Sequence, residues 1–202
     1  MKRVEFFFDF VSPYSYLAHT RVGRVCEEAD AELVPRPMLL GAILNETGGR
    51  AATEVPAKER YMRRDLGLWA ESYGAPLRFP DPFPFRSLKT MRAALWFQER
   101  GSLPAFVNEA FSLYWAEGGS PKGMKEADED EPIAEVARRI GEDPDEVLEG
   151  AAQPAAKEAL KSATAEALER SVFGAPTFFV GDEMFWGNDR LPFVEAALGR
   201  LS

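Results

Sequence analysis

The sequence is poor in the side chains that most disulfide and metal sites need. It holds a single cysteine, Cys26, and a single histidine, His19. One cysteine excludes a disulfide framework within the chain, and it also excludes a zinc ribbon or finger. One histidine excludes the usual histidine-rich metal sites, so we predict no metal site. His19 is also the only histidine available to a catalytic triad.

Positive charge and long hydrophobic runs are also scarce. Lys and Arg number 24 against 33 Asp and Glu, which gives a net charge of −9. An acidic protein repels phosphate backbones, so nucleic acid is not an expected partner. The longest apolar run, Met38 to Leu44, is far too short to span a membrane, and the first residues lack a secretory signal pattern. We therefore expect a soluble, cytoplasmic protein that binds no membrane.

What the chain does hold is an ordered series of apolar segments. With 202 residues, 46% of them hydrophobic, it can form one or two domains with a buried core. Aromatic, β-prone runs predict strands, and apolar residues at helical spacing predict helices. The predicted strands cover 4–10, 32–36, 177–180 and 184–186. The predicted helices cover 13–29, 38–45, 56–73, 88–99, 104–117, 132–141, 144–151, 154–171 and a last one that ends near 200.

Two segments between the helices have a biased composition. Four prolines among aromatic residues at 75–86 predict an extended, polyproline-like loop. The acidic run at 125–131 predicts a solvated turn or the start of a helix.

The two ends of the chain predict one α/β domain. The N-terminal strand–helix–strand unit implies a right-handed parallel pair, and the C-terminal hairpin leads into a helix. Neither end has enough strands alone, so both are expected in one sheet. We therefore predict a thioredoxin-like fold with a large all-helical insertion. Residues 1–44 and 172–202 form the thioredoxin-like domain, and residues 45–171 form the inserted helical subdomain.

Three separated motifs resemble one protein family. They are FDFVSPYSYLA at 8–18, GAPTFFVGDEMFWG at 174–187 and NDRL at 188–191, and LLGAIL at 39–44 and VPAKERYMRRDL at 55–66 extend the similarity. The family is that of 2-hydroxychromene-2-carboxylate isomerase, a glutathione-dependent relative of DsbA and of kappa-class glutathione transferases. The resemblance implies glutathione as cofactor, a homodimer, and an isomerase that acts on an unsaturated aromatic carboxylate.

Ser12 is the predicted catalytic residue. In related disulfide oxidoreductases this turn reads Cys-x-x-Cys, whereas here Ser12 and Ser15 replace the thiols and exclude a disulfide cycle. A helix N-terminus offers free N–H groups and partial positive charge, and a serine hydroxyl there can donate to a bound thiolate. The resemblance therefore implies that Ser12 stabilises the glutathione thiolate. The alternative is an ordinary Ser-Pro helix cap.

Other nucleophile arrangements fit the sequence less well. A serine-hydrolase triad on Ser12 needs His19 as base, but His19 lies further along the same helix and no G-x-S-x-G elbow is present. We expect His19 to be a partly exposed helix residue. Cys26 falls on the apolar face of that helix, so we expect it in the core.

The second motif predicts the part of the glutathione site that faces Ser12. The resemblance implies a cis bond between Ala175 and Pro176, which presents the Ala175 backbone to the cysteinyl main chain of glutathione. From the residues alone, the alternative is a proline that starts an edge strand.

The third motif predicts the opposite end of the glutathione site. Trp186 and Gly187 precede Asn188 and Asp189, and either Asn188 or Asp189 can cap the last helix. Backbone N–H groups at a helix start hold carboxylates, so the γ-glutamyl carboxylate fits there. Asp189 can accept from the α-amino group of glutathione.

Asn45, Phe83 and Arg86 are the predicted substrate residues. Many family members carry a lysine near position 45, which suits a substrate carboxylate, whereas Asn45 offers a neutral hydrogen bond. Arg50 and Arg86 are candidates for the missing cation. Phe83, together with Phe85 in the same proline-rich loop, can line an aromatic pocket.

Three functions follow from these residues and the resemblance. The first is a glutathione-dependent isomerase for a substrate such as 2-hydroxychromene-2-carboxylate, by thiolate addition, ring opening and elimination. The second is a kappa-like glutathione transferase that conjugates electrophiles. The third is a non-enzymatic thioredoxin-fold binding module, which has no affinity for glutathione.

Overall fold

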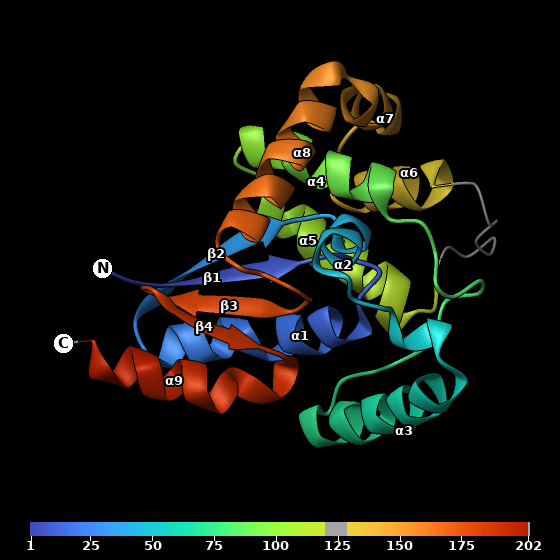
Figure 1. The fold of residues 1–202 in the computed structure, drawn as a ribbon. Coiled ribbons are helices and arrows are strands. Elements are labelled where there is room, and N and C mark those ends of the chain that lie inside the picture. Colours follow the sequence, from blue (N-terminus) through green and yellow to red (C-terminus); the bar gives the residue numbers. More distant parts are fainter. Residues whose placement is uncertain (120–128, 202) are drawn as a thin grey trace.

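A four-stranded sheet forms the middle of the molecule (Figure 1). The computed structural model describes residues 1–119 and 129–201. Strand β1 (Lys2–Phe8) pairs in parallel with β2 (Ala31–Pro37) and antiparallel with β3 (Thr177–Val180). Strand β4 (Glu183–Trp186) pairs antiparallel with β3 and forms one edge. Both ends of the chain therefore share one sheet, which confirms the predicted topology.

Helices cover both faces of this sheet. Helices α1 (Pro13–Glu28) and α9 (Leu191–Arg200) lie on one face, and α2 (Leu40–Thr47) and α8 (Pro154–Glu169) lie on the other (Figure 1). The remaining helices between β2 and β3 are α3 (Pro56–Tyr73), α4 (Leu88–Glu99), α5 (Leu103–Phe111), α6 (Asp130–Arg139) and α7 (Pro144–Ala152). Short helical turns are η1 (Ala52–Glu54), η2 (Ser112–Ala116) and η3 (Asn188–Arg190). A thioredoxin-like α/β fold with a helical insertion is confirmed.

Successive side chains of β1 point to opposite faces of the sheet, so β1 packs against helices on both faces. Phe6 packs on Phe178 towards α1, with ring centroids 5.2 Å apart. Phe7 points to the opposite face and meets Phe179 at 5.6 Å, beside residues of α2 and α8. Phe8 contacts Phe111 of the insertion at 5.5 Å, so the sheet and the inserted helices share one core. The domain boundaries at 44/45 and 171/172 stay a prediction.

The predicted helix over 104–117 does not continue as an α-helix to its end. Helix α5 stops at Phe111 and the π-helical turn η2 follows. The indole N–H of Trp115 donates to the Phe10 carbonyl at 2.7 Å, and the Trp115 carbonyl accepts from the Arg78 N–H at 2.7 Å. The first bond anchors the Trp115 side chain to the loop after β1, and the second occupies a carbonyl that a continuing α-helix would use, so both favour the wider turn.

The structure confirms one of the two predictions for the acidic run at 125–131 and contradicts the solvation of Glu129. Residues 125–128 lie outside the described part of the chain. Glu129 is buried rather than solvated, and its carboxylate accepts from the backbone N–H of Lys89. Burial raises the pKa of Glu129 above its usual value, although backbone hydrogen bonds from Lys89 and Thr90 and the positive charge of Arg86 lower it. Asp130 begins α6, as one of the two predictions for this run expected.

None of the described helices combines the length and the apolar character that a membrane span needs.

Candidate active site

Ser12 lies at the N-terminus of α1, directly after the loop that follows β1. It is the N-cap residue, and its hydroxyl oxygen accepts from the Ser15 N–H at 3.1 Å. The same hydroxyl donates to the Ala175 carbonyl at 3.2 Å. Pro13 has no N–H, and the Tyr14 N–H donates to no described residue. The helix start therefore presents one hydroxyl proton and one backbone N–H that a bound anion can use.

The segment that faces Ser12 has the predicted geometry. The bond between Ala175 and Pro176 is cis. The hydrogen bond between Ser12 and Ala175 joins residues 163 positions apart in the sequence. The Pro176 carbonyl accepts from the Gly187 N–H at 2.9 Å, which holds the third motif beside the second.

A cavity of about 430 Å³ includes Ala175 in its wall; we call it the polar cavity because Asp65, Asn188, Asp189 and Arg190 line it. Tyr14 of α1 contributes to its wall, α3 contributes Tyr61, Asp65 and Trp69, and the C-terminal segment contributes Ala175, Pro176, Trp186, Gly187, Asn188, Asp189 and Arg190. All the residues predicted to bind glutathione line this cavity except Ser12. Ser12 lies just beyond it, in contact with Ala175.

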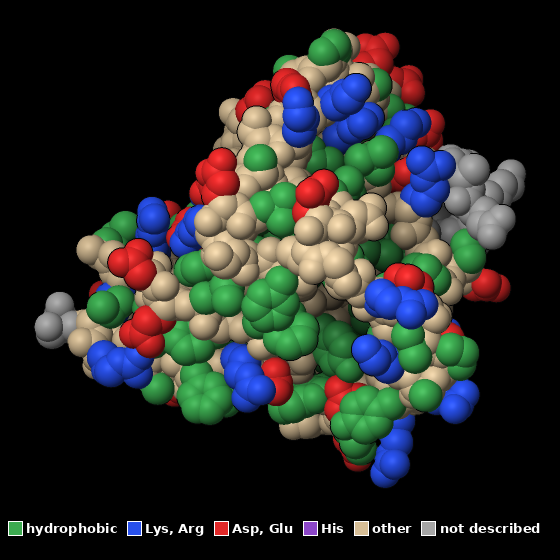
Figure 2. Space-filling view, viewed as in Figure 1, with side chains coloured by type: hydrophobic (Ala, Val, Ile, Leu, Met, Phe, Trp, Pro, Cys, Tyr) green, Lys and Arg blue, Asp and Glu red, His purple; other side chains and the backbone are tan. Residues whose placement is uncertain are grey.

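A second, apolar cavity of about 290 Å³ includes both Ser12 and Ala175 in its wall. Its lining is mostly aliphatic and aromatic, with residues from the β1–α1 loop, α2, the 50–53 segment, the proline-rich loop and the segment after α8. Tyr14, Ala175 and Trp186 belong to both cavities. In this part of the surface a hollow floored by hydrophobic side chains is visible in the space-filling view (Figure 2).

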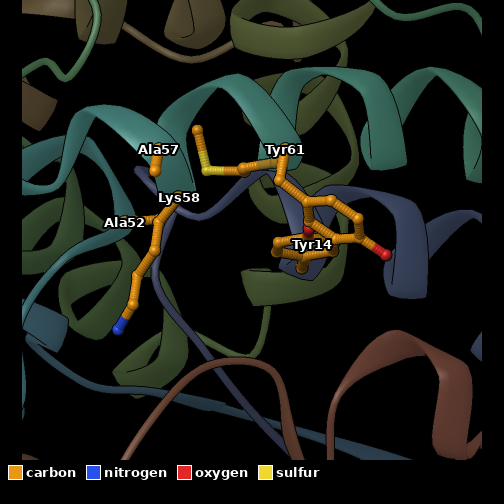
Figure 3. A pocket seen from close by; sticks show the side chains of 6 residues that line it. Tyr14, Ala52, Ala57, Lys58 and Tyr61 are labelled. Atoms are coloured by element: carbon orange, nitrogen blue, oxygen red, sulfur yellow. The ribbon is translucent and has the colours of Figure 1, made fainter.

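A third cavity of about 390 Å³ adjoins both and is drawn in Figure 3. Lys58, Tyr61 and Met62 reach it from α3, and Tyr14 reaches it from α1. Tyr14 is the one described residue that lines all three cavities. The Tyr14 ring is therefore a shared wall at the centre of the site.

A hydrogen bond to α3 fixes the Tyr14 ring. The Tyr14 hydroxyl donates to Asp65 Oδ2 at 2.8 Å. Burial and the neighbouring Asp65 carboxylate raise the pKa of Tyr14 well above its ordinary value. The phenol therefore stays protonated at neutral pH and acts as a hydrogen-bonded wall rather than as a charged group.

Asp9 fixes Ser12 relative to the apolar cavity. Its buried carboxylate accepts from the Val11 N–H at 3.1 Å and from the Leu40 N–H at 2.9 Å. Its carbonyl accepts from the Ser12 N–H at 3.0 Å. Burial raises the pKa of Asp9 above its usual range, while hydrogen bonds from Ser87, Leu40 and Val11 oppose this rise. One side chain thus connects the turn at Ser12 to the start of α2.

The predicted capping role of Asn188 and Asp189 is wrong. The turn η3 and then α9 follow Gly187, and neither has a side-chain cap. Pro192 stands in the first turn of α9 and has no N–H for a cap to accept. Asn188 is buried, and its Nδ2 has no hydrogen-bond partner among the described residues. Other atoms of Asn188 reach the wall of the polar cavity, whereas its Nδ2 is itself buried.

The predicted substrate residues separate into two groups. Phe83 lines the apolar cavity, and Arg50 does as well. Asn45 is exposed on α2 and is not part of the wall of any described cavity at the site. Arg86 is exposed and pairs with Glu129 at 3.8 Å, also away from these walls. Phe85 is buried and stacks on Tyr114 with ring centroids 4.5 Å apart.

Sequence reasoning missed the contribution of α3. Lys58, Tyr61, Asp65 and Trp69 follow one another at intervals of three or four residues, so they lie on one side of the helix. That spacing was a usable signal, because a helix face with large polar and aromatic residues is unusual for a purely solvated surface.

The lone histidine and cysteine lie apart from the site. The His19 ring stacks between Phe6, at 6.5 Å, and Phe111, at 5.0 Å. Burial lowers the pKa of His19 to about 4. Cys26 is buried, as predicted, and burial raises the pKa of its thiol to about 11. Neither residue lines the cavities at Ser12.

Comparisons with known proteins agree with this architecture. The family model for the DSBA-like thioredoxin domain matches residues 3–199. The 2-hydroxychromene-2-carboxylate isomerase of Pseudomonas putida is 36% identical and covers 98% of this chain and 95% of its own. Glutathione S-transferase kappa 1 of Homo sapiens is 28% identical, covering 98% of this chain and 91% of its own.

A solved structure shares the fold at similar coverage. The structure of selenomethionine 2-hydroxychromene-2-carboxylate isomerase has a TM-score of 0.86 and 34% identity, covering 98% of this chain and 95% of its own. Both the sequence and the fold therefore match along nearly the whole chain. The chain belongs to the 2-hydroxychromene-2-carboxylate isomerase family, within the DSBA-like thioredoxin-domain proteins.

Proposed function

We propose that this protein is a glutathione-dependent isomerase of an unsaturated aromatic carboxylate such as 2-hydroxychromene-2-carboxylate. One observation carries the proposal: Ser12, at the start of α1, lines the apolar cavity and donates to Ala175, which lines both the apolar and the polar cavity. A thiol peptide fits the polar side and an aromatic substrate fits the apolar side. The printed names of the relatives, isomerases and kappa glutathione transferases, favour the same chemistry.

The donors and acceptors of the polar cavity suit glutathione. Asp189 offers a carboxylate to an α-amino group. Arg190 and the neighbouring Lys58 add positive charge for a peptide that carries two carboxylates. The Ala175 backbone lies beside Ser12, where a cysteinyl main chain can pair with it.

When bound, glutathione supplies a thiolate that adds to the unsaturated carboxylate, permits ring opening and bond rotation, and is released unchanged. Ser12 would donate its hydroxyl proton to that sulfur instead of to Ala175, and the Tyr14 N–H would add a second donor. Together with the helix dipole, these donors favour the ionised thiol. The apolar wall, including Phe83, would exclude water from the aromatic substrate.

The test is turnover with and without glutathione. The protein is mixed with 2-hydroxychromene-2-carboxylate, the product is followed by absorbance and NMR, and free glutathione is measured by chromatography. We expect isomerisation that requires glutathione and leaves its concentration unchanged. Stoichiometric loss of glutathione would instead identify a kappa-like transferase. An absence of glutathione binding in calorimetry would identify a binding module and refute the proposal.

A further inference from the structure

The apolar cavity contains one charged residue in its wall. Among the described residues that line it, Arg50 alone carries a formal charge. The others are aliphatic or aromatic side chains, small residues, and the hydroxyl-bearing Ser12, Thr53 and Tyr14. A cavity of this kind favours a ligand with an apolar body and a single negative group.

The Arg50 guanidinium is available to such a ligand. It makes no hydrogen bond to a described residue, and its ion pair with Glu54 joins Nε and Oε2 at 3.6 Å. Both side chains are more than half exposed, so this pair contributes little to stability. Glu54 is also engaged elsewhere, because its Oε1 accepts from the Ala51 N–H at 2.8 Å. A carboxylate ligand can bind the guanidinium through two parallel hydrogen bonds, which is a stronger arrangement.

The other cations near the site are less well placed for this cavity. Arg86 pairs with Glu129 and lines none of the three cavities. Lys58 lines the adjoining cavity beside Tyr61, and Arg190 lines the polar one. Arg50 is therefore the cation that shares a cavity with both Ser12 and Phe83.

We propose that Arg50 binds the substrate carboxylate in the apolar cavity and so restricts the substrates to apolar, aromatic carboxylates. The proposal rests on the proposed isomerase function for the identity of the substrate. With the carboxylate held at Arg50 and the ring against Phe83, the unsaturated bond is confined to the cavity that Ser12 lines.

The kinetic test compares three variants at Arg50 and a matched position. Arg50→Gln should raise KM for 2-hydroxychromene-2-carboxylate about 10- to 100-fold, with kcat changed less than about threefold. Arg50→Lys should recover part of the loss, because charge is kept while the two-pronged geometry is lost. Arg24→Gln is the control. Arg24 pairs through Nε with Glu28, four residues later in the same helix, and this pair is about as exposed as the pair of Arg50 with Glu54. Arg24 lines none of the three cavities. This substitution should leave KM unchanged.

A binding test separates this proposal from the proposed function. Coumarin-3-carboxylate and its neutral carboxamide serve as probes, and fluorescence titration gives their dissociation constants with S-methylglutathione present and absent, because this analogue has no thiol that can add to the probes. Wild-type protein should bind the carboxylate at least about 10-fold more tightly than the carboxamide, and Arg50→Gln should bind both equally. If wild-type protein prefers the carboxylate probe to the carboxamide but does not isomerise the substrate, the proposed function is refuted and the role of Arg50 stands.

Three results would overturn the role of Arg50. The first is an unchanged KM in Arg50→Gln while wild-type protein isomerises the substrate. The second is wild-type protein that shows no preference for the carboxylate probe. The third is a loss of that preference in Lys58→Gln but not in Arg50→Gln. Near-ultraviolet circular dichroism of each variant checks that the exposed substitution leaves the fold intact.

Discussion

The polar and apolar cavities share a boundary but are built from different parts of the chain. The polar cavity takes its charged groups from α3 and from the segment around Asp189. The apolar cavity takes its wall from the β1–α1 loop, α2 and the proline-rich loop, with Arg50 as its single charge. Tyr14, Ala175 and Trp186 belong to both walls.

This difference indicates a division of work in the proposed reaction. The side with carboxylate, amide and guanidinium groups suits a peptide with several charges, whereas the other side suits a flat molecule with one. Because the two walls share few residues, substitutions on one side should leave binding on the other side unchanged. Ser12, at the junction, should affect chemistry more than either binding step.

The largest effect is expected at Gly187, on the polar side. Its φ of +110° is a conformation that favours glycine, and an added Cβ would lie 2.4 Å from Asp189 Oδ1. Gly187→Ala should weaken glutathione binding about 100-fold and cost about 1–2 kcal/mol of unfolding free energy. Calorimetry measures the first and urea unfolding the second. Binding of coumarin-3-carboxylate should not change.

Gly141→Ala is the control for backbone strain. Gly141 has a φ of +80° but open space around its Cβ position, and it lies between α6 and α7. It should lose similar stability and keep full glutathione affinity. Equal losses of affinity in both variants would show that strain alone, and not the shape of the polar cavity, is being measured.

The next effect is expected at the junction. Ser12→Ala should raise the pKa of the bound glutathione thiol by about one to two units, because one donor to the thiolate is lost. Turnover at neutral pH should then fall about 10- to 100-fold and partly recover at higher pH. Glutathione affinity should change less, and so should binding of the carboxylate probe. Thiolate absorbance against pH in both complexes is the measurement.

Ser12→Thr keeps a hydroxyl and a helix cap, so it separates thiol activation from capping. The alanine variant also loses a cap worth about 1 kcal/mol, which unfolding experiments would detect. Superimposable thiol titrations for wild type and Ser12→Ala would mean that the Tyr14 N–H and the helix dipole activate the thiol without the hydroxyl.

Two substitutions with smaller effects should each weaken binding in only one of the two cavities. Phe83→Ala removes an aromatic wall of the apolar cavity and should weaken binding of coumarin-3-carboxylate about 10-fold, with glutathione affinity unchanged. Asp189→Asn removes the carboxylate for the α-amino group and should give the reverse pattern at a similar size. Both constants come from the same titrations. A loss of both affinities in either variant would show that the cavities are not independent.

The fold was largely predictable because its signals are local. The predicted bounds of α3 and α4 match those observed, since strong apolar periodicity and flanking proline or glycine mark them. The C-terminal end of the helix predicted over 104–117 was not predictable, because the hydrogen bond from Trp115 to Phe10 joins residues 105 positions apart. The burial of Glu129 likewise depends on a partner outside its own segment, Lys89, which lies 40 positions away in the sequence.

The site was predictable only where it consists of contiguous motifs. Ser12, Ala175 and Asp189 stand in stretches that carry the family resemblance, and the structure brings these stretches together. Arg50 and Arg86 were equivalent candidates in the sequence, because nothing local distinguishes one exposed arginine from another. Only the fold places Arg50 in the wall that contains Ser12 and leaves Arg86 beside Glu129.

The smallest effect on either cavity is expected at His19, which lies in neither wall. Burial lowers its pKa from 6.5 to about 4, so between these values the unfolded chain binds a proton that the folded chain does not. The unfolding free energy should therefore fall as pH drops from about 6.5 to about 4, by at most about 3 kcal/mol from this residue. His19→Gln, which cannot titrate, should lose this dependence while both ligands bind at pH 7 as in wild type. Urea unfolding at pH 7, 5.5 and 4 gives the difference between the two proteins, and a difference that stays constant over this range would contradict the lowered pKa of this half-buried histidine.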